Sequence, residues 1–171
     1  GKRRVIPDLL IEMPEDFDHY YETFIGGGAL FFHLRSQNVL ADHKITIADA
    51  NFRLIRTYRA IRDDVDGVIE RLAHHLKRNS SEYFYQVRDV EVDKYKRDVD
   101  VAAWFIYLNK TAFNGLYRVN KKNRFNAPFG RYKKPNICDE TNLLACHEAL
   151  QTVEILHGCF DYSSKSAKAG D

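Results

Sequence analysis

Apolar and polar residues recur along the chain with two different periods, and each change of period marks an expected element. Residues 19–23 alternate and are rich in aromatic side chains, and residues 45–48 are mainly apolar, so both segments predict short strands. Apolar residues at helical spacing follow each strand, over residues 29–34 and 51–62. The repeated order of strand and helix is typical of an α/β nucleotide-binding cleft.

The middle of the chain is helical by the same criterion. An apolar stripe runs from Val65 to Leu76, residues 79–81 break that helix, and Ser81 is expected to cap the next one. The expected helices cover about residues 65–78, 82–90 and 98–110. Asp139 or Thr141 is expected to cap a further helix that reaches about residue 151, and strand character returns at 152–156. A strand–helix cleft is therefore interrupted by a helical insert and then resumed.

Length and composition fit one domain, or one domain with an inserted subdomain. The longest apolar run, residues 101–108, is far short of a membrane span, and no signal-peptide pattern opens the chain. Cys138, Cys146 and Cys159 lack paired spacing, so free thiols are expected instead of disulfides or a zinc site. The seven histidines are scattered, and no metal site is expected.

Charge is concentrated in one segment. Residues 109–135 hold eight basic residues and no acidic one, with aromatic side chains between the charges. The rest of the chain carries 18 basic and 24 acidic residues. Such a segment is a plausible footprint for a polyanion, and a solvated basic surface is the alternative. Asn114-Gly115 and Pro128-Phe129-Gly130 are turn signals that favour an extended loop or a β-hairpin here.

The first predicted strand runs into three consecutive glycines, Gly26 to Gly28, and a helix follows. This arrangement lets backbone N–H groups and a helix N-terminus approach a ligand closely. Asp49, about 20 residues further on, is placed to accept hydrogen bonds from ribose hydroxyls. The GxGxxG pattern of dinucleotide enzymes fails because position 31 is Phe31. A merely flexible glycine turn, with Asp49 as a helix cap, is the alternative.

Three segments together resemble the Dam-type DNA adenine-N6 methyltransferases (class D12, alpha group), in the same order and over nearly the whole chain. They are residues 22–28 (ETFIGGG), residues 49–51 (DAN) with Leu54 and Ile55, and residues 113–118 (FNGLYR) with 125–135 (FNAPFGRYKKP). The resemblance implies an α/β fold: a Rossmann-like S-adenosylmethionine-dependent core with an inserted, mostly helical target-recognition domain that carries a basic β-hairpin. The implied division is residues 1–58 (core), 59–138 (insert, with the hairpin at about 112–133) and 139–171 (core).

The resemblance also implies a set of cofactor-binding residues, which would contact S-adenosylmethionine. Lys2 matches the end of an N-terminal WAGGK segment, the loop residues match an FxGxG pattern, and the acidic residue would hold the ribose. These residues are Lys2, Phe24, Gly26, Gly28 and Asp49. Thr23 replaces a proline that is usual in this loop.

For DNA, the resemblance implies that Arg118 reads a guanine, because a guanidinium forks onto O6 and N7 in the major groove. Leu116 and Pro128 would contact a thymine methyl, Phe113 would insert beside the displaced adenine, and Asn114 would support the hairpin. Five further residues would contact phosphates or carry solvated charge: Lys121, Lys122, Arg124, Lys133 and Lys134.

The implied reaction methylates N6 of an adenine flipped out of duplex DNA, in the sequence GATC, without a metal. The family's catalytic Asp-Pro-Pro-Tyr motif does not occur in these residues. We therefore expect an excerpt of a longer protein that continues with this motif beyond Asp171, and no catalytic residue or activity in the chain alone. The expected partner is double-stranded DNA. The protein itself is expected to be cytoplasmic and monomeric in solution, and to bind DNA in one or more copies.

Two alternatives remain open from the sequence. One is a non-catalytic DNA-binding module derived from the same family, and the other is an enzyme that acts on small molecules or RNA through the same cleft. A role in restriction–modification fits the family.

Overall fold

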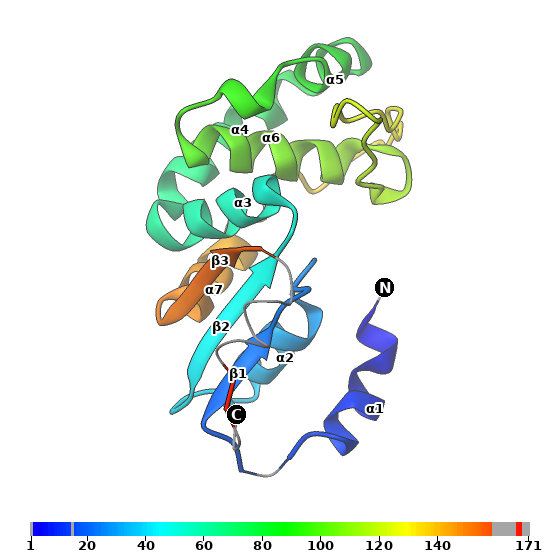
Figure 1. Ribbon diagram of the computed structural model, residues 1–171. Helices are drawn as coiled ribbons and strands as arrows, with labels where there is room; N and C mark the ends of the chain where they lie inside the picture. The colour runs from blue at the N-terminus through cyan, green and yellow to red at the C-terminus, as the bar shows by residue number, and fades with distance from the viewer. Residues whose placement is uncertain (1, 15, 159–166, 169–171) are drawn as a thin grey trace. The chain divides into compact units, whose positions relative to one another are not determined.

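The computed structural model describes residues 2–14, 16–158 and 167–168. The chain divides into two compact units, one formed by residues 1–55 with 148–171 and the other by residues 56–147 (Figure 1). Each unit has its own packed core.

The first unit contains a three-stranded parallel sheet with the order β1-β2-β3. The strands are β1 (His19–Glu22), β2 (Lys44–Asp49) and β3 (Val153–His157), which confirms the three strands predicted from the sequence. In the register, Glu22 pairs with Ile47 and Asp49 pairs with His157. Because all three strands are parallel, their carboxyl ends meet at one edge of the sheet.

Helices and strands of the first unit share an apolar core. Its helical elements are η1 (Lys2–Val5), α1 (Ile6–Ile11) and α2 (Ala29–Ser36). Phe31 and Leu34 of α2 are fully buried, as is Ile47 in the centre of β2. Figure 1 shows α2 running along the sheet. This packing holds the beginning of α2 beside the edge at which the strands end.

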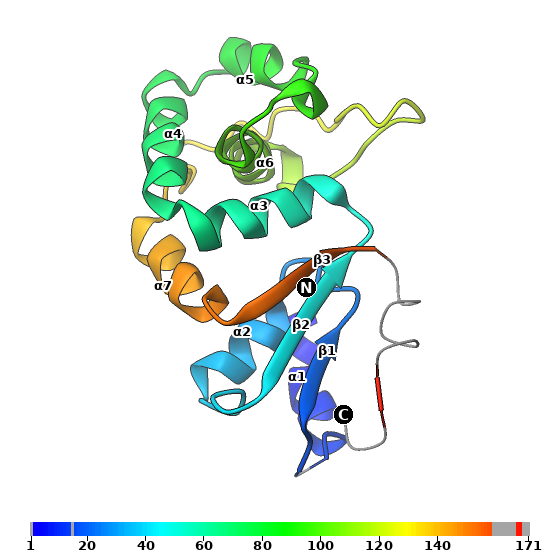
Figure 2. The same cartoon turned by 60° about the vertical axis from the view of Figure 1, so that its left-hand side comes forward.

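The second unit is helical. Its elements are α4 (Val65–Arg78), α5 (Ser81–Arg88), η2 (Val92–Lys94), α6 (Asp98–Thr111) and η3 (Phe113–Gly115). Two further helices, α3 (Phe52–Asp63) and α7 (Glu140–Leu150), each have residues in both units. Figure 2 shows α6 end-on, with α4 and α5 around it. Four consecutive residues of α6, Val101 to Trp104, are all buried, so this helix is enclosed on every side at this point.

Local capping corrects one expectation about these helices. The residue that caps α5 is Ser80, whose side chain accepts a hydrogen bond from the Tyr83 N–H at 3.1 Å, whereas Ser81 is already the first helical residue. At α7, Asp139 accepts from the Asn142 N–H at 3.3 Å. Ser80 has the extended backbone that an N-cap requires, which a reading of residue type alone could not distinguish from Ser81.

The basic segment, residues 109–135, reverses direction after α6. Within it the structure assigns two isolated antiparallel bridges, Ala112 with Phe129 and Val119 with Phe125, instead of regular strands. Pro128 has no N–H and cannot donate to a continuous ladder, although its carbonyl accepts from Phe113 at 2.9 Å. Together these contacts give an irregular two-stranded arm, which we call the basic arm.

A glycine attaches the basic arm to the end of α6. The Gly130 N–H donates to the Thr111 carbonyl at 2.8 Å. A Cβ at this position would lie 2.9 Å from the carbonyl oxygens of both Thr111 and Ala112, so the close approach of the two backbones requires glycine. In the described part of the chain, no helix combines the length and the apolar character needed to cross a membrane.

Candidate functional site

The candidate cofactor site lies at the edge where the three parallel strands end. Asp49 is the last residue of β2, and its carboxylate accepts from the Gly26 N–H at 3.0 Å and from the Asn51 N–H at 2.8 Å. Its carbonyl oxygen accepts from the Gly158 N–H at 3.1 Å. Each carboxylate oxygen has a second lone pair, so the half-buried Asp49 keeps acceptor capacity for a ligand.

Asn51, and not Asp49, is the cap of α3. The Asn51 Oδ1 accepts from the Arg53 N–H at 3.2 Å and from the Leu54 N–H at 3.4 Å, and the Asn51 carbonyl begins the helical ladder by accepting from Ile55. The sequence had left open that Asp49 only caps a helix. The structure assigns that task to Asn51 and places Asp49 at the edge where the parallel strands end.

The glycine loop is left-handed at two positions. Gly26 has a φ of 50° and Gly28 has a φ of 65°, whereas Gly27 lies outside the left-handed region. Only glycine adopts such values without a steric cost, which explains why the first and third glycines of the loop match the FxGxG pattern. Gly28 is the N-cap of α2, and its carbonyl accepts from the Phe32 N–H at 2.9 Å.

Glu22 is a residue of this site to which the sequence had assigned no role. Its Oε2 accepts from the Phe31 N–H in the first turn of α2 at 3.1 Å and from the Tyr20 hydroxyl at 2.7 Å. Burial, together with the negative charge of Glu22, raises the pKa of Tyr20 far above its ordinary value. Glu22 therefore fixes the start of α2 to the end of β1, and its position directly before the glycine loop was the available signal.

Exposed aromatic side chains flank Asp49 along the same edge. Phe24 is 58% exposed and Phe52 is 48% exposed. The ring of His157 lies 4.9 Å from that of Phe52, and the His157 Nε2 is 3.1 Å from the Ala50 carbonyl oxygen. The sequence did not single out Phe52 or His157, because the register of β3 beside β2 is what brings them together.

The glycine loop also forms part of the wall of a cavity of about 580 Å³ within the first unit. Gly27 and Gly28 line it together with Phe32 of α2 and with Pro7 and Leu10 of α1. Its size falls within the range of small-molecule sites.

On the basic arm, the side chains expected to read DNA are exposed. Phe113 is 50% exposed and Leu116 is 47% exposed, and Asn114, Arg118 and Pro128 are exposed as well. The five expected phosphate contacts are also exposed: Lys121, Lys122, Arg124, Lys133 and Lys134. All of these residues are accessible to a partner.

Other side chains of the basic arm are buried and anchor it. Phe125 and Ala127 are buried, and the Phe125 ring lies edge-on to Trp104 of α6 with 5.9 Å between centroids. Tyr117 packs against Phe105, with 4.9 Å between the rings. The arm is thus an ordered surface that rests on α6, and its anchors and its exposed groups are interleaved in sequence.

Two hydrogen-bonded pairs hold arginines of the basic arm. The Arg118 Nε donates to the Asn126 Oδ1 at 2.8 Å, and the Arg118 Nη2 donates to the Asn126 carbonyl at 2.9 Å. Arg124 forms an ion pair with Glu91 at 2.9 Å. Neither Asn126 nor Glu91 was assigned a role from the sequence. Glu91 lies 33 positions from Arg124, and Asn126, eight positions from Arg118, meets it only because the arm folds back on itself.

Comparison with known sequences decides the family. The sequence model of the D12 class N6 adenine-specific DNA methyltransferase family matches residues 1–171. The chain belongs to this family. The resemblance carried by its three motifs is therefore confirmed.

Relatives of this chain occur in bacteria, in an archaeon and in a virus. The chain is 42% identical to the type II methyltransferase M1.LlaDCHI of Lactococcus lactis subsp. cremoris, with 100% of the chain and 60% of the relative covered. It is 39% identical to the type II methyltransferase M.MjaIII of Methanocaldococcus jannaschii, with 94% and 60% covered. It is 31% identical to the DNA adenine methylase of Escherichia coli strain K12, with 100% and 58% covered. The chain thus spans about three fifths of the length of these relatives.

The family resemblance implies five residues that would contact the cofactor. Among them, Gly26 is hydrogen-bonded to Asp49, and Phe24 and Gly28 lie in the same loop as Gly26. Lys2 belongs to η1, and its side chain lies outside the described part of the structure. The ligand contacts of all five residues remain predictions.

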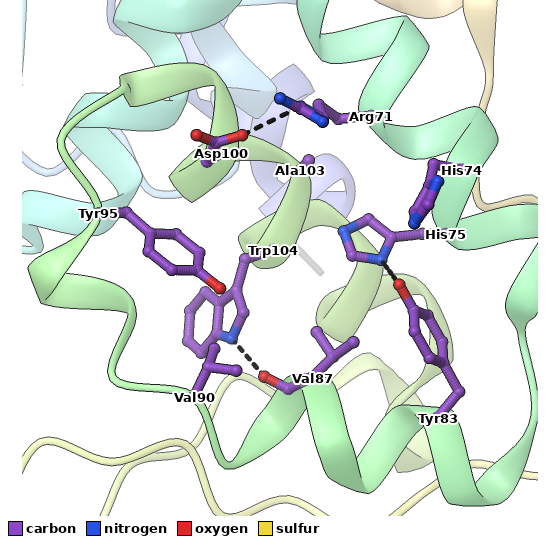
Figure 3. A pocket seen from close by; sticks show the side chains of 10 residues that line it. All are labelled: Arg71, His74, His75, Tyr83, Val87, Val90, Tyr95, Asp100, Ala103 and Trp104. Atoms are coloured by element: carbon purple, nitrogen blue, oxygen red, sulfur yellow. Dashed lines mark hydrogen bonds and ion pairs between the residues drawn. The ribbon is translucent and has the colours of Figure 1, made fainter.

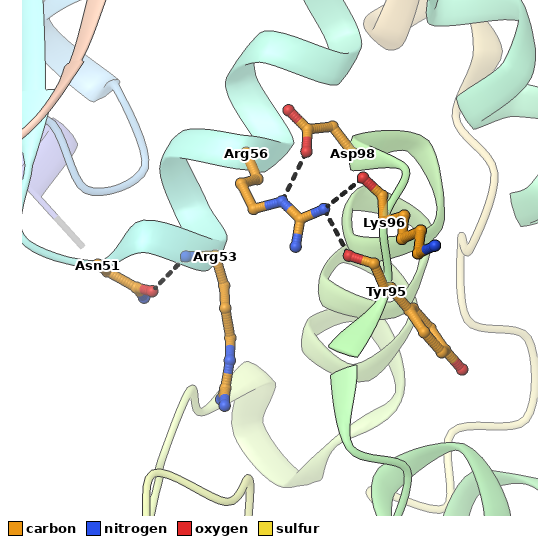
Figure 4. Close-up of polar contacts among 6 residues, drawn as sticks. All are labelled: Asn51, Arg53, Arg56, Tyr95, Lys96 and Asp98. Carbon is orange, nitrogen blue, oxygen red and sulfur yellow. Dashed lines mark hydrogen bonds and ion pairs between the residues drawn. The ribbon is translucent and has the colours of Figure 1, made fainter. Parts of the chain in front are cut away.

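A buried arginine braces the helices of the second unit (Figure 4). The Arg56 Nε donates to Asp98 at 2.6 Å, and its Nη2 donates to the carbonyls of Tyr95 at 2.8 Å and Lys96 at 3.2 Å. Arg56 lies on α3 and Asp98 is the first residue of α6. The clamp therefore fixes the amino end of the helix whose other end carries the basic arm.

A second cavity, of about 220 Å³, lies among α4, α5 and α6 (Figure 3). The His75 Nδ1 is 2.8 Å from the Tyr83 hydroxyl, and the His75 ring stacks on Tyr107 at 4.7 Å. Burial, with smaller contributions from His74 and Arg71, lowers the pKa of His75 to about 4. None of the residues predicted to bind a ligand lines this cavity, so the cluster is a packing feature of the unit.

The described cysteines are free thiols. Cys138 and Cys146 are free, and Cys159 lies outside the described residues. Among the residues that the structure describes, no three His, Cys, Asp or Glu side chains are grouped to hold a metal ion.

Proposed function

We propose that the protein containing this chain transfers a methyl group from S-adenosylmethionine to N6 of an adenine flipped out of duplex DNA, with GATC as the recognised sequence. The observation that carries the proposal is the combination of Asp49 bonded to the left-handed Gly26 with a basic arm that exposes Arg118. Membership of the D12 class supports the reaction type.

The residues at the sheet edge fit an adenosyl ligand. Asp49 has unused lone pairs for two ribose hydroxyls, as its position at the end of a parallel strand suggests. Gly26 and Gly28 have no side chain, so the loop backbone can approach the methionine portion of the donor closely. The exposed Phe24 offers an apolar surface beside the loop.

The donor supplies an electrophilic methyl group on its sulfonium. In the proposed transfer the S–CH₃ bond breaks, a bond from N6 to this carbon forms, and one amino proton is released to an acceptor. The chain's residues hold the donor in place, which lowers the entropic part of the barrier. The chain spans about three fifths of the length of its relatives, and the family's acceptor motif, Asp-Pro-Pro-Tyr, does not occur in its 171 residues. The proposal therefore concerns the whole protein and assigns no acceptor within this chain.

The basic arm provides the groups that GATC recognition needs. Arg118 is suited to a guanine, and the exposed Leu116 and Pro128 are suited to a thymine methyl. Phe113, half exposed at the start of the arm, has the size and apolar character to fill the space that a flipped adenine leaves. The lysines contribute phosphate contacts that are independent of sequence.

The test measures transfer of a radiolabelled methyl group from S-adenosylmethionine by the full-length protein. A GATC duplex should accept the label, whereas a duplex with a scrambled site and a duplex already methylated at both adenines should not. Site-selective binding without any methyl transfer would identify a DNA-binding module and reject the enzymatic proposal. Equal labelling of the scrambled duplex would reject GATC as the target.

A further inference from the structure

Arg118 is held in one orientation by Asn126. The side-chain oxygen of Asn126 accepts from Nε at 2.8 Å, and its backbone carbonyl accepts from Nη2 at 2.9 Å. The Asn126 N–H in turn donates to the Arg118 carbonyl at 2.9 Å. Three hydrogen bonds therefore connect two residues that face each other across the basic arm.

Asn126 is itself fixed by its neighbours in sequence. Phe125 is buried against Trp104, and Ala127 is fully buried. Val119, next to Arg118, forms an isolated bridge with Phe125. Asn126 is thus attached to the core of the helical unit, whereas the Arg118 side chain is exposed.

A guanidinium has two edges that can each donate a pair of parallel hydrogen bonds. The side edge carries Nε and Nη2, and the end edge carries Nη1 and Nη2. Asn126 occupies the side edge. Among the described residues nothing accepts a hydrogen bond from Nη1, and one Nη2 hydrogen is left as well. The end of the guanidinium is therefore the edge available for a base.

We propose that Asn126 is a positioning residue that turns the Nη1–Nη2 end of Arg118 toward O6 and N7 of the recognised guanine. This inference rests on the proposed function, in which Arg118 reads that guanine. Ordering a long side chain before binding removes a cost worth about two- to twelvefold in affinity. Asn126 therefore acts on specificity through Arg118 without contacting the base.

The experiment measures binding of the full-length protein, saturated with S-adenosylhomocysteine, to a GATC duplex and to the same duplex with the guanine pair replaced by adenine·thymine. Asn126→Ala should lower the ratio of the two affinities by about two- to twelvefold. Asn126→Asp keeps the acceptor oxygen, so the ratio should stay near the wild-type value while the added negative charge weakens binding to both duplexes.

Two controls separate positioning from general order of the basic arm. The Asn120 side chain accepts from Lys122 N–H and Arg124 N–H at the turn and does not contact Arg118, so Asn120→Ala should leave the ratio unchanged. In an Arg118→Ala background, Asn126→Ala should have no further effect on the ratio, because a positioning residue has nothing left to position.

The possible outcomes are distinct. A wild-type protein without preference for the guanine would reject the proposed recognition itself. Loss of preference in Arg118→Ala but not in Asn126→Ala would overturn only the positioning role. An equal loss in Asn120→Ala, or an additive loss in the double variant, would also overturn it, because the arm as a whole would then be responsible.

Discussion

At the scale of single residues, the Asp49 carboxylate joins two backbone segments. It fixes the glycine loop through Gly26 and the turn before α3 through Asn51, and we propose that its remaining lone pairs accept hydrogen bonds from the methyl donor. A charged acceptor shared by two backbone N–H groups is stronger and better oriented than a neutral one. Binding and loop geometry should therefore be lost together when the charge is removed.

Asp49→Asn tests this coupling. The amide replaces one acceptor oxygen by a donor that would face a backbone N–H, so affinity for S-adenosylhomocysteine should fall by about 1.5–3 kcal/mol. Isothermal titration calorimetry of the full-length protein measures the change. Asp42→Asn is the matched control, because Asp42 is exposed and precedes β2 at the opposite edge of the sheet. Equal affinities of the two variants would exclude Asp49 from the cofactor site.

Adjacent glycines of the loop differ in what they require. Gly26→Ala forces an alanine to a φ of 50° and should destabilise the first unit by about 1–2 kcal/mol, whereas Gly27→Ala meets open space outside the left-handed region and should be neutral. Thermal unfolding followed by circular dichroism compares them. A similar loss in both variants would show that the loop is sensitive to bulk and not to backbone conformation.

At the scale of elements, helix packing in the second unit depends on a neutral histidine. His75 of α4 contacts Tyr83 of α5 and stacks on Tyr107 of α6. The nearby charged and titratable groups are Arg71, His74 and the two tyrosines. Because burial lowers the pKa of His75 to about 4, the unfolded chain binds a proton at this residue at higher pH than the folded chain does.

The free energy of unfolding of the second unit should therefore decrease as the pH falls from about 6.5 to about 4. His75 should account for about 2 kcal/mol of this decrease, a figure reduced to allow for its partial exposure. Urea unfolding followed by Trp104 fluorescence reports on this unit, since the chain has a single tryptophan. His75→Gln should flatten the pH dependence in this window, whereas His74→Gln should not. A slope that is unchanged in His75→Gln would assign the acid sensitivity to other groups.

At the scale of the whole molecule, the sequence predicted the elements that depend on local pattern. Strands and helices followed from periodicities of two and 3.6 residues, and the glycine positions followed from a motif whose reason is backbone conformation. Contacts between distant residues were not predictable. Arg56 meets Asp98 across 42 positions, and Asn126 meets Arg118 only after the basic arm has folded back on α6.

The distribution of charge over the chain gives a last prediction. Five exposed basic residues of the arm are expected to contact phosphates, so the logarithm of DNA affinity should fall with the logarithm of salt concentration with a slope of about −4.5. Replacing Lys121 and Lys122 by Gln should reduce the slope by about two and leave the preference for the guanine unchanged, because phosphate contacts carry no sequence information. Replacing Lys77 and Arg78, which are exposed at the end of α4, removes the same charge elsewhere and should change the slope little. Equal changes from both pairs would mean that net charge, and not the basic arm, governs DNA binding.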